Sequence, residues 1–354
     1  MTEDEKYMRR CIQLAKNGQQ NAKPNPMVGA VIVSADGRII GEGYHVRCGQ
    51  GHAEVNAFAS VRAEDEPLLK EATIYVSLEP CSHYGKTPPC CDMIIARGIP
   101  RVVIGSADPN VQVNGAGIER MRAAGVDVKV GVLEDECSRL NRAFFTSQLH
   151  KRPYVTLKWA QSADGFIDLL REEGEAVKIS SPVSQVAVHK LRAQNGAILV
   201  GRHTALLDDP SLNIRHWAGR APLRLVIDKT GMLPADLKMF DGTLPTVVYT
   251  ACEKSGKFGK NVEQVVLDFA APLLPQILSH LNACKIDSLL VEGGATVLQS
   301  FINASLWDEA RVEVNPSLEL GSGVVAPSLA PCQPYAEESL AGNRILRFHR
   351  LKTP

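Results

Sequence analysis

The sequence has no excess of charge of either sign. Its 39 lysines and arginines balance 39 aspartates and glutamates, so the formal net charge at pH 7 is +0. Proteins that bind nucleic acid or anionic membranes by long-range electrostatic attraction carry a net positive charge. No basic segment interleaved with aromatic residues stands out here either. The composition therefore argues against nucleic acid and membrane partners, and a small charged metabolite is the expected partner.

Long apolar runs are also missing. No segment approaches the roughly 18 apolar residues of a membrane span, and the acidic, amphipathic start at residues 1–10 lacks the apolar stretch of a signal peptide. The 9 cysteines are an odd number scattered along the chain, which is unlike a secreted disulfide framework. We expect a protein of the reducing cytoplasm.

The length predicts more than one domain. At 354 residues, with 45% hydrophobic residues, the chain can form two sizeable cores. A polar segment closed by a proline lies at residues 149–153, and no long internal repeat is evident. We therefore expect two different domains, residues 1–148 and residues 153–354.

Strand and helix patterns alternate in both halves, which is typical of an α/β layer fold. In the first half the predicted helices are 3–18, a helix from 52, 115–124 and 134–148, and the predicted strands are 28–33, a partner from 39, 73–78, 102–105 and 126–130. In the second half the predicted helices are 182–194, 272–281 and 295–303, and the predicted strands are 154–159, 197–200, 223–227, 246–249 and 288–291.

One group of residues in the first half indicates a zinc site that activates water. A catalytic zinc needs three protein ligands and one open position, which His52, Cys81 and Cys90 can supply. The order H-x-E, then P-C and a later Cys, is the signature of zinc deaminases, which hydrolyse the exocyclic amine of a cytosine-like or adenine-like ring. Glu54 is the predicted general acid and base, because it stays off the metal and can carry a proton to the departing ammonia.

The spacing of the cysteines leaves alternatives open. Deaminases usually have C-x-x-C, whereas Cys81 and Cys90 are nine positions apart. From the residues alone, Cys81 could be an idle core thiol, and the site could be a closed structural zinc site. Neighbouring helical side chains point about 100° apart, so we expect one of Cys90 and Cys91 to pack rather than bind metal.

Three segments of the first half resemble the riboflavin-biosynthesis deaminase family. They are E-P-C-S-H-Y-G-K-T-P-P-C at residues 79–90, P-N-P-M-V-G at 24–29 and G-E-G-Y-H at 41–45. In that family the first and last cysteines of the long stretch bind zinc, which implies that the unusual spacing is a family feature. The resemblance also implies a cytidine-deaminase-like three-layer fold, with Asn25, His45 and Lys86 as contacts to the substrate's pyrimidine or phosphate.

Four segments of the second half resemble the reductase half of the bifunctional riboflavin enzymes. They are residues 158–165, 191–193, 201–215 and 291–295. The resemblance implies a dihydrofolate-reductase-like α/β fold that uses NADPH to convert a ribosyl phosphate side chain to a ribityl phosphate. It covers nearly the whole chain.

Hydride transfer to a sugar phosphate needs a nicotinamide pocket, a group that polarises the sugar, and cations for the phosphate. Arg192 and Arg215 are suited to bidentate phosphate contacts, and Lys158 and Glu292, at predicted strand ends, can polarise the sugar. The Gly-Gly turn before residue 295 offers a helix N-terminus to the cofactor's phosphates. With the residues that the resemblance adds, the predicted substrate contacts are Arg192, Leu212, Arg215 and Glu292, and the predicted cofactor contacts are Lys158, Ala160, Thr204, Asp208, Gly294, Ala295, Thr296, Val297, Leu298, Gln299 and Ser300.

The chain departs from the reductase pattern at Asn195-Gly196, which replaces an acidic or small pair before a strand, and at a second segment. Residues 176–180 read A-V-K-I-S where the family has S-x-W-I-[ST], so a hydroxyl is lost at Ala176 and an aromatic platform at Lys178. We therefore do not carry over the family's cofactor contacts to these two positions.

The resemblance implies a bifunctional riboflavin-pathway enzyme that forms a homo-oligomer, a dimer or a tetramer. Its first activity is the zinc-dependent deamination of 2,5-diamino-6-(5-phosphoribosylamino)pyrimidin-4(3H)-one, and its second is the NADPH-dependent reduction of the ribosyl side chain. The alternative is a deaminase whose C-terminal domain is inactive and serves oligomerisation. A nucleic-acid editing deaminase is disfavoured by the neutral charge.

Overall fold

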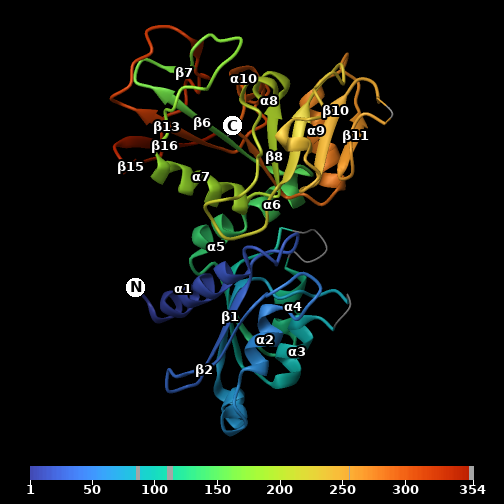
Figure 1. Cartoon of the computed structure of the whole chain (residues 1–354). Coiled ribbons are helices and arrows are strands. Elements are labelled where there is room, and N and C mark those ends of the chain that lie inside the picture. Colours follow the sequence, from blue (N-terminus) through green and yellow to red (C-terminus); the bar gives the residue numbers. More distant parts are fainter. Residues whose placement is uncertain (85–87, 110–114, 255, 351–354) are drawn as a thin grey trace. The chain divides into compact units, whose positions relative to one another are not determined.

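The computed structural model describes residues 1–84, 88–109, 115–254 and 256–350 (Figure 1). The chain divides into two units, Met1–Lys151 and Arg152–Pro354. The division falls inside the polar segment 149–153. None of the helices in the described ranges is long and apolar enough to cross a membrane.

A five-stranded sheet forms the middle layer of the N-terminal unit. Its order is β2-β1-β3-β4-β5; β1 runs antiparallel to β2 and β3, while β3, β4 and β5 are parallel. The strands are β1 Gly29–Val33, β2 Ile39–Tyr44, β3 Thr73–Leu78, β4 Arg101–Ser106 and β5 Asp127–Val130.

Helices cover both faces of this sheet. The helices are α1 Glu3–Ala15, α2 Ala53–Ala59, α3 Cys90–Arg97, α4 Ala116–Ala123, α5 Glu134–Leu140 and α6 Arg142–His150, with short 3₁₀ turns at Lys16–Gly18 and Ala63–Glu71. Successive strand residues point to opposite faces, so Ile74 and Val76 pack in the core under α2, α3 and α4, while Tyr75 packs with α1 and α5. The unit therefore has the expected three layers.

The helix expected at 134–148 is interrupted, and that expectation is wrong in this respect. Asn141 separates α5 from α6 with φ −106° and ψ 21°, outside helical geometry. Its buried amide donates to the carbonyl oxygen of Met27 at 2.9 Å and accepts from the Met27 N–H at 2.8 Å. This tertiary contact stabilises the break.

The C-terminal unit contains a nine-stranded sheet of order β11-β10-β9-β8-β12-β6-β13-β16-β15. The first seven strands in this order are parallel, and β16 and β15 are antiparallel to their neighbours. The strands are β6 Tyr154–Ser162, β8 Ala197–Gly201, β9 Leu223–Ile227, β10 Thr246–Thr250, β11 Val262–Val266, β12 Ser288–Val291, β13 Glu309–Asn315, β15 Ala336–Leu340 and β16 Asn343–His349; β7 Phe166–Asp168 pairs separately with β14 Val324–Val325.

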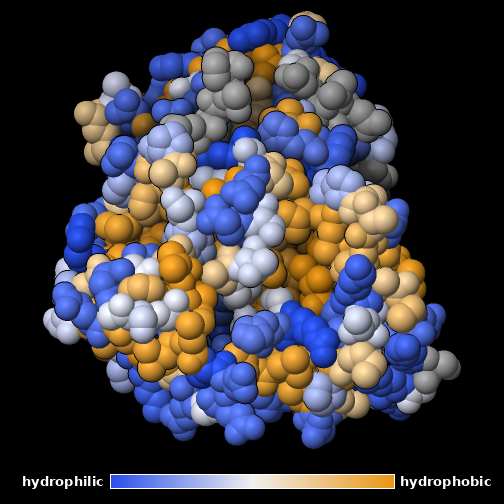
Figure 2. Space-filling view, turned by 90° about the horizontal axis from the view of Figure 1, so that it is seen from above, coloured by the Kyte–Doolittle hydropathy of each residue, from blue (hydrophilic) through white to orange (hydrophobic). Residues whose placement is uncertain are grey.

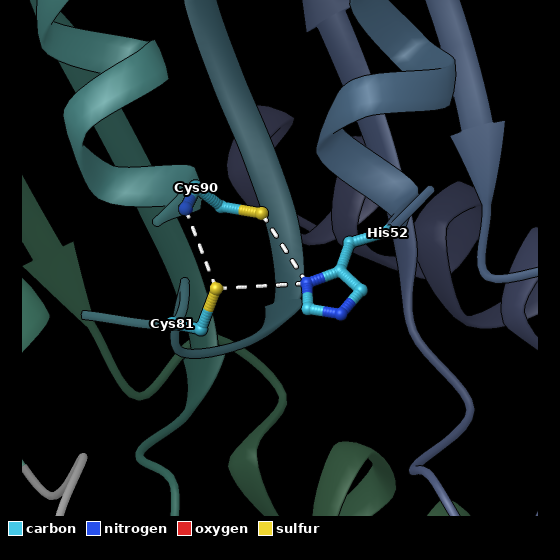
Figure 3. A group of neighbouring side chains, drawn as sticks. All are labelled: His52, Cys81 and Cys90. Atoms are coloured by element: carbon cyan, nitrogen blue, oxygen red, sulfur yellow. Dashed lines mark hydrogen bonds between the residues drawn. The ribbon is translucent and has the colours of Figure 1, made fainter. Parts of the chain in front are cut away.

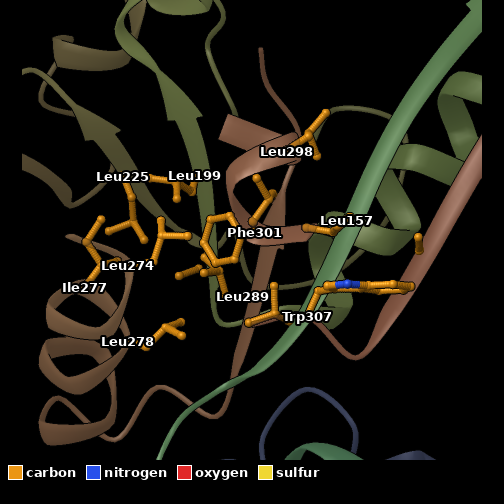
Figure 4. Packing of buried hydrophobic residues seen from close by; sticks show 14 of the residues in the cluster. Leu157, Leu199, Leu225, Leu274, Ile277, Leu278, Leu289, Leu298, Phe301 and Trp307 are labelled. Atoms are coloured by element: carbon orange, nitrogen blue, oxygen red, sulfur yellow. The ribbon is translucent and has the colours of Figure 1, made fainter. Parts of the chain in front are cut away.

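In the described part of this unit, the α-helices are α7 Pro182–Gln194, α8 Arg202–Asp208, α9 Leu273–Ala283 and α10 Ala295–Asn303, with a 3₁₀ turn at Lys238–Phe240. Figure 4 shows how Ile277 of α9 and Phe301 of α10 pack against Leu199 and Leu289 of the sheet. Each of these side chains is fully buried, and burial of one such side chain stabilises the fold by about 1.5–3 kcal/mol.

The predicted α/β class is confirmed, and several elements match the expectation from the sequence. The helix Pro182–Gln194 and the strands Leu223–Ile227 and Ser288–Val291 have the predicted bounds. Strand β6 runs to Ser162 instead of ending at Trp159, so Lys158 lies inside a strand rather than at its end. The short helix α8 and all the strands after residue 303 have no counterpart in the expectation.

Candidate metal centre and cofactor cavity

His52, Cys81 and Cys90 direct one nitrogen and two sulfurs at a common point (Figure 3). The Nδ1 atom of His52 lies 3.5 Å from Cys81 Sγ and 3.4 Å from Cys90 Sγ. A tetrahedral zinc holds nitrogen at about 2.0 Å and sulfur at about 2.3 Å, which separates two such ligands by about 3.5 Å. The three residues therefore fit a zinc ion with one position left open.

Each ligand sits at the end of a secondary-structure element. His52 is the N-cap of α2, Cys81 follows β3, and Cys90 is the first residue of α3, directly after Pro89. Proline is well suited to end an extended segment before a helix, and the helix N-terminus favours a thiolate. The backbone N–H of Cys90 donates to Cys81 Sγ at 3.3 Å, which brings the two sulfur ligands together.

The two thiols and Glu54 have shifted acidities. The hydrogen bond from the Cys90 thiol lowers the pKa of Cys81 to about 4 despite its burial, and the same hydrogen bond raises the pKa of Cys90. Glu54 is 3% exposed, and burial, assisted by the charge of Cys81, raises its pKa to about 7. A carboxyl group with this pKa can both take up and release a proton near neutral pH, as a general acid and base must.

Cys91 faces away from this centre. It is fully buried in the hydrophobic cluster that contains Ile94 and Met121, and its Sγ lies 3.6 Å from Asp92 Oδ1. Burial raises the pKa of the Cys91 thiol to about 11. Cys91 is thus the packing cysteine of the adjacent pair.

Asn25 and His45 lie beside the metal ligands. The His45 ring packs edge-on against His52 with centroids 5.4 Å apart, and its Nδ1 donates to the carbonyl oxygen of Gly51 at 3.1 Å. Its Nε2 accepts from the Asn25 amide at 3.2 Å, and burial lowers the pKa of His45, which favours this neutral form. Both residues are near enough for the predicted substrate contacts. Lys86 lies outside the described residues.

One organising residue of this site was missed from the sequence. Glu79, 4% exposed, directly follows the last residue of β3 and lies two residues before Cys81. Its carboxylate accepts backbone N–H bonds of 3.0–3.4 Å from Asp108, Gly115, Gly117 and Ile118. Glu79 thereby ties the zinc-binding strand end to the start of α4. Its only sequence signal was an acid directly before Pro-Cys.

The C-terminal unit contains a cavity of about 1220 Å³. Residues of β6, β7, α8 and the first turn of α10 line it. On the face seen in Figure 2, hydrophobic and hydrophilic residues lie side by side around a hollow in the surface. The residues predicted from the sequence that line the cavity are Lys158, Ala160, Thr204, Asp208, Glu292, Gly294, Ala295, Thr296, Val297 and Leu298.

The other predicted contacts do not line this cavity. The amide of Gln299 donates to Asn303 and accepts from Ser328, and the Ser300 hydroxyl donates to the carbonyl oxygen of Thr296. A helix turns about 100° per residue, so only part of the run from Gly294 to Ser300 can face one ligand. The remaining three, Arg192, Leu212 and Arg215, belong to a neighbouring cluster.

In that cluster Arg192 donates to both carboxylate oxygens of Glu292, at 2.7 and 3.1 Å. Leu212 is buried in the hydrophobic core, and Arg215 is exposed, with its guanidinium donating to Asn213 Oδ1 at 2.7 Å. Burial opposes the charge of Glu292, but Arg192 outweighs it and lowers the Glu292 pKa. Burial lowers the pKa of Lys158, which faces the same carboxylate from β6.

The start of α10 suits the phosphates of a nucleotide. Gly294 precedes the helix with φ +78°, a conformation that favours glycine. A Cβ at Gly293 would lie 2.9 Å from side-chain carbons of both Val200 and Thr204. Backbone N–H groups at a helix N-terminus bind anions. The absence of a side chain at Gly293 thus lets the start of α10 lie close to Val200 and Thr204. This arrangement suits the phosphates of a dinucleotide cofactor.

Three residues that were not among the predicted cofactor contacts also lie at the cavity. Ala176 and Lys178 both line it, and the Lys178 ammonium lies 3.3 Å from a Glu175 oxygen. Arg171, which was not predicted, forms ion pairs with Asp168 and Asp208 and so holds the predicted cofactor contact Asp208 in place.

The N-terminal unit therefore has the fold and donor set of a zinc-dependent deaminase. The C-terminal unit has a largely parallel sheet and a cavity beside a helix N-terminus, which fits a nucleotide-dependent reductase. Family models match both units. Residues 1–106 match the zinc-binding region of cytidine and deoxycytidylate deaminases, and residues 153–334 match the RibD C-terminal domain.

Similarity extends over the whole chain. The riboflavin biosynthesis protein RibD of Aquifex aeolicus is 40% identical over 91% of this chain and 89% of its own length, and that of Synechocystis is 42% identical over 93% and 88%. A bifunctional deaminase and reductase of Thermotoga maritima superposes with a TM-score of 0.89 at 37% identity, covering 99% of both chains. Acinetobacter baumannii RibD gives 0.87 at 33% identity over 99% of both chains. The chain belongs to the RibD family of riboflavin-biosynthesis proteins.

Proposed function

We propose that this protein carries out two consecutive steps of riboflavin synthesis. The N-terminal unit deaminates 2,5-diamino-6-(5-phosphoribosylamino)pyrimidin-4(3H)-one, and the C-terminal unit reduces the ribosyl side chain of the product with NADPH. The observation that carries the proposal is the convergence of His52, Cys81 and Cys90 beside the buried Glu54. The Thermotoga maritima relative is described as a deaminase and reductase of these two pyrimidine nucleotides.

In the deamination, His52, Cys81 and Cys90 would hold a zinc ion, which would supply the Lewis acid that activates water near neutral pH. Glu54 takes the proton of the attacking water on a carboxylate oxygen and passes it to the amine nitrogen, so that ammonia leaves. Its burial keeps bulk water from exchanging this proton. Asn25 and His45, and Lys86 outside the described residues, are the proposed substrate contacts.

In the reduction, NADPH supplies the hydride. Gly294 and the first turn of α10 hold cofactor phosphates, and Ala160, Thr204 and Asp208 bind the rest of the cofactor in the cavity. Lys158 and Glu292 orient and polarise the sugar, Leu212 is a further substrate contact, and Arg215 receives the phosphate. Arg192 acts by keeping Glu292 ionised and in place.

Two broader properties are part of the proposal. All 9 cysteines are free thiols, which suits a reducing cytoplasm. We expect a homo-oligomer, a dimer or a tetramer, and light scattering of the purified protein measures its mass directly.

The test is to incubate the purified protein with the diaminopyrimidine nucleotide, with and without NADPH, and to identify the products by mass spectrometry. Without NADPH, oxygen replaces an NH group; with NADPH, two further hydrogens appear. Glu54→Gln is expected to keep its zinc and its NADPH oxidation with the deaminated nucleotide but to lose ammonia release. Full ammonia release by this variant would refute the role of Glu54.

One observation favours a second candidate, a deaminase with an inactive C-terminal unit. The hydroxyl and the aromatic ring of the family pattern are absent at Ala176 and Lys178, which line the cavity. This candidate predicts ammonia release without any substrate-dependent oxidation of NADPH. The same incubation therefore separates the two.

A further inference from the structure

The segment between α8 and β9 has no regular structure up to residue 215, yet α7 holds it at two points. The Arg192 guanidinium donates to the carbonyl oxygen of Asn213 at 3.1 Å. One turn earlier on α7, the Nδ1 atom of His189 accepts the backbone N–H of Arg215 at 3.0 Å. Two adjacent turns of one helix thus fix the main chain on both sides of residue 214.

His189 is built to remain an acceptor. It is 4% exposed, and its ring packs edge-on against His216 with centroids 4.8 Å apart. A backbone N–H can only donate, so Nδ1 carries no proton and the ring is neutral. Burial, with the nearby charges of Arg192, Arg215 and His216, lowers the pKa of His189 to about 4, so this form persists at neutral pH.

The charges around His189 single out Arg215. Arg192 is neutralised by both carboxylate oxygens of Glu292. In the described ranges Arg215 has no carboxylate within ion-pair distance; its guanidinium donates to the neutral amide oxygen of Asn213 and is exposed. An arginine with unpaired donors can bind a phosphate in a bidentate manner. Among these groups Arg215 is the cation available to a phosphorylated ligand.

We propose that His189 is a positioning residue for phosphate recognition in the C-terminal unit: by holding the backbone of Arg215, it aims the guanidinium at the phosphate of the ribosyl side chain. The inference rests on the proposed reductase activity. Without this bond the backbone of residue 215 can rotate, and a small rotation displaces the far end of a long side chain. Phosphate affinity is lost, whereas cofactor binding in the cavity is untouched.

The experiment compares His189→Leu, which removes the acceptor, with His189→Asn, whose amide oxygen can occupy about the place of Nδ1. Each is tested alone, and His189→Leu is also combined with Arg215→Met. The steady-state constants are measured for the deaminated nucleotide, for the same compound without its phosphate, and for NADPH. Two controls show whether each full-length variant is folded. Ammonia release reports on the N-terminal unit, and the KM for NADPH reports on the cofactor cavity of the C-terminal unit.

For His189→Leu we expect a KM for the phosphorylated substrate about tenfold higher, the effect of about one lost hydrogen bond, with kcat and the KM for NADPH within about twofold of the wild type. The constants for the substrate without phosphate stay unchanged. His189→Asn recovers most of the affinity. The double variant is no weaker than Arg215→Met, because both changes remove the same contact. Calorimetric titration with ribose 5-phosphate and with ribose should rank the affinities of the variants in the same order, in the absence of catalysis.

The results separate three failures. If the wild type oxidises no NADPH with the deaminated nucleotide, the proposed reductase activity is wrong. If the enzyme is active but Arg215→Met loses no preference for the phosphorylated substrate, Arg215 is no phosphate contact and the inference falls while the function stands. If Arg215→Met loses that preference but His189→Leu weakens both substrates equally, adds to Arg215→Met, or is not rescued by Asn, His189 is a packing residue only.

Discussion

Arg192 and Glu292 form a bidentate ion pair between positions that are 100 residues apart in the sequence. The donors of Arg192 lie 2.7 and 3.1 Å from the two carboxylate oxygens, and the side chains are only 13% and 6% exposed. The pair joins α7 to the end of β12, beside the cofactor cavity. A buried charge of this kind is tolerated only while its partner stays in place.

We predict that Arg192→Met destabilises the C-terminal unit by about 3 kcal/mol, because Glu292 is left as a buried charge without its main partner. NADPH oxidation should be lost and ammonia release retained. Arg97→Met is the matched control, since Arg97 pairs with Glu66 at the surface with side chains 42% and 41% exposed; its loss should cost less than about 1 kcal/mol. Urea unfolding of the two variants measures the difference, and equal costs would contradict the prediction.

The neighbouring cysteines 90 and 91 should differ sharply in metal binding. Cys90→Ala removes a sulfur that lies 3.4 Å from His52 Nδ1, so the purified variant should lose most of its zinc and its ammonia release. Cys91→Ala removes only packing, at a cost of about 1 kcal/mol, and should keep both. Zinc is counted by mass spectrometry of metals. A zinc-free Cys91→Ala protein that is folded would reverse the assignment of the two residues.

The sequence sufficed where local pattern determines structure. Helix Pro182–Gln194 begins at a Ser cap followed by proline, and the strand Leu223–Ile227 is a short run that follows a proline and is apolar except for Arg224. The break at Asn141 could not be seen, because it depends on a contact with Met27, 114 residues away. Strand β13 alternates charged and apolar residues, yet its charged residues Arg311 and Glu313 are also buried, because neighbouring strands cover them.

The candidate site likewise contains residues that the sequence identified and residues that only the fold revealed. The motif around His52, Glu54 and the cysteines identifies the metal centre because its chemistry requires those residue types. Residue types alone could not rank Cys90 against Cys91; the family resemblance chose Cys90, and the burial of Cys91 in the hydrophobic cluster agrees with that choice. The clamp formed by Glu79 depends on where the fold places the backbone of Asp108 and of residues 115–118. Such partners are set by tertiary structure, and no local pattern encodes them.

Acid should weaken the anchor of the N-terminal helix. Burial opposes the charge of Asp4, but hydrogen bonds from Arg101, Lys129 and Tyr75 outweigh it and lower its pKa from 3.8 to about 2. The folded state thus binds the proton less readily than the unfolded chain, so the contribution is complete above about pH 4 and is lost as the pH falls from 3.8 towards 2. Lys129 is half exposed, so we expect about 1–2 kcal/mol rather than the full shift.

Asp4→Asn tests this contribution to stability. The variant should be less stable than the wild type at pH 7 by this amount, and the difference should shrink as the pH is lowered through 3 to 2. Denaturant unfolding at each pH gives the two curves. A difference that stayed constant down to pH 2 would show that the charge of Asp4 is not the cause.

Gly294 should be required for cofactor binding rather than for folding. A residue with a Cβ would have a strained backbone at φ +78°, and the Cβ would lie 3.2 Å from the Thr204 hydroxyl oxygen, at the N-terminus of α10. Gly294→Ala is therefore expected to cost about 1 kcal/mol in stability and to weaken NADPH binding at least tenfold, because the first turn must shift away from the phosphates.

Gly342→Ala is the control, since Gly342 has φ +87° with nothing within 4 Å of a new Cβ. It should carry a similar backbone strain and bind NADPH normally. Fluorescence titration with NADPH separates the two variants, and equal affinities would mean that the start of α10 does not hold the cofactor.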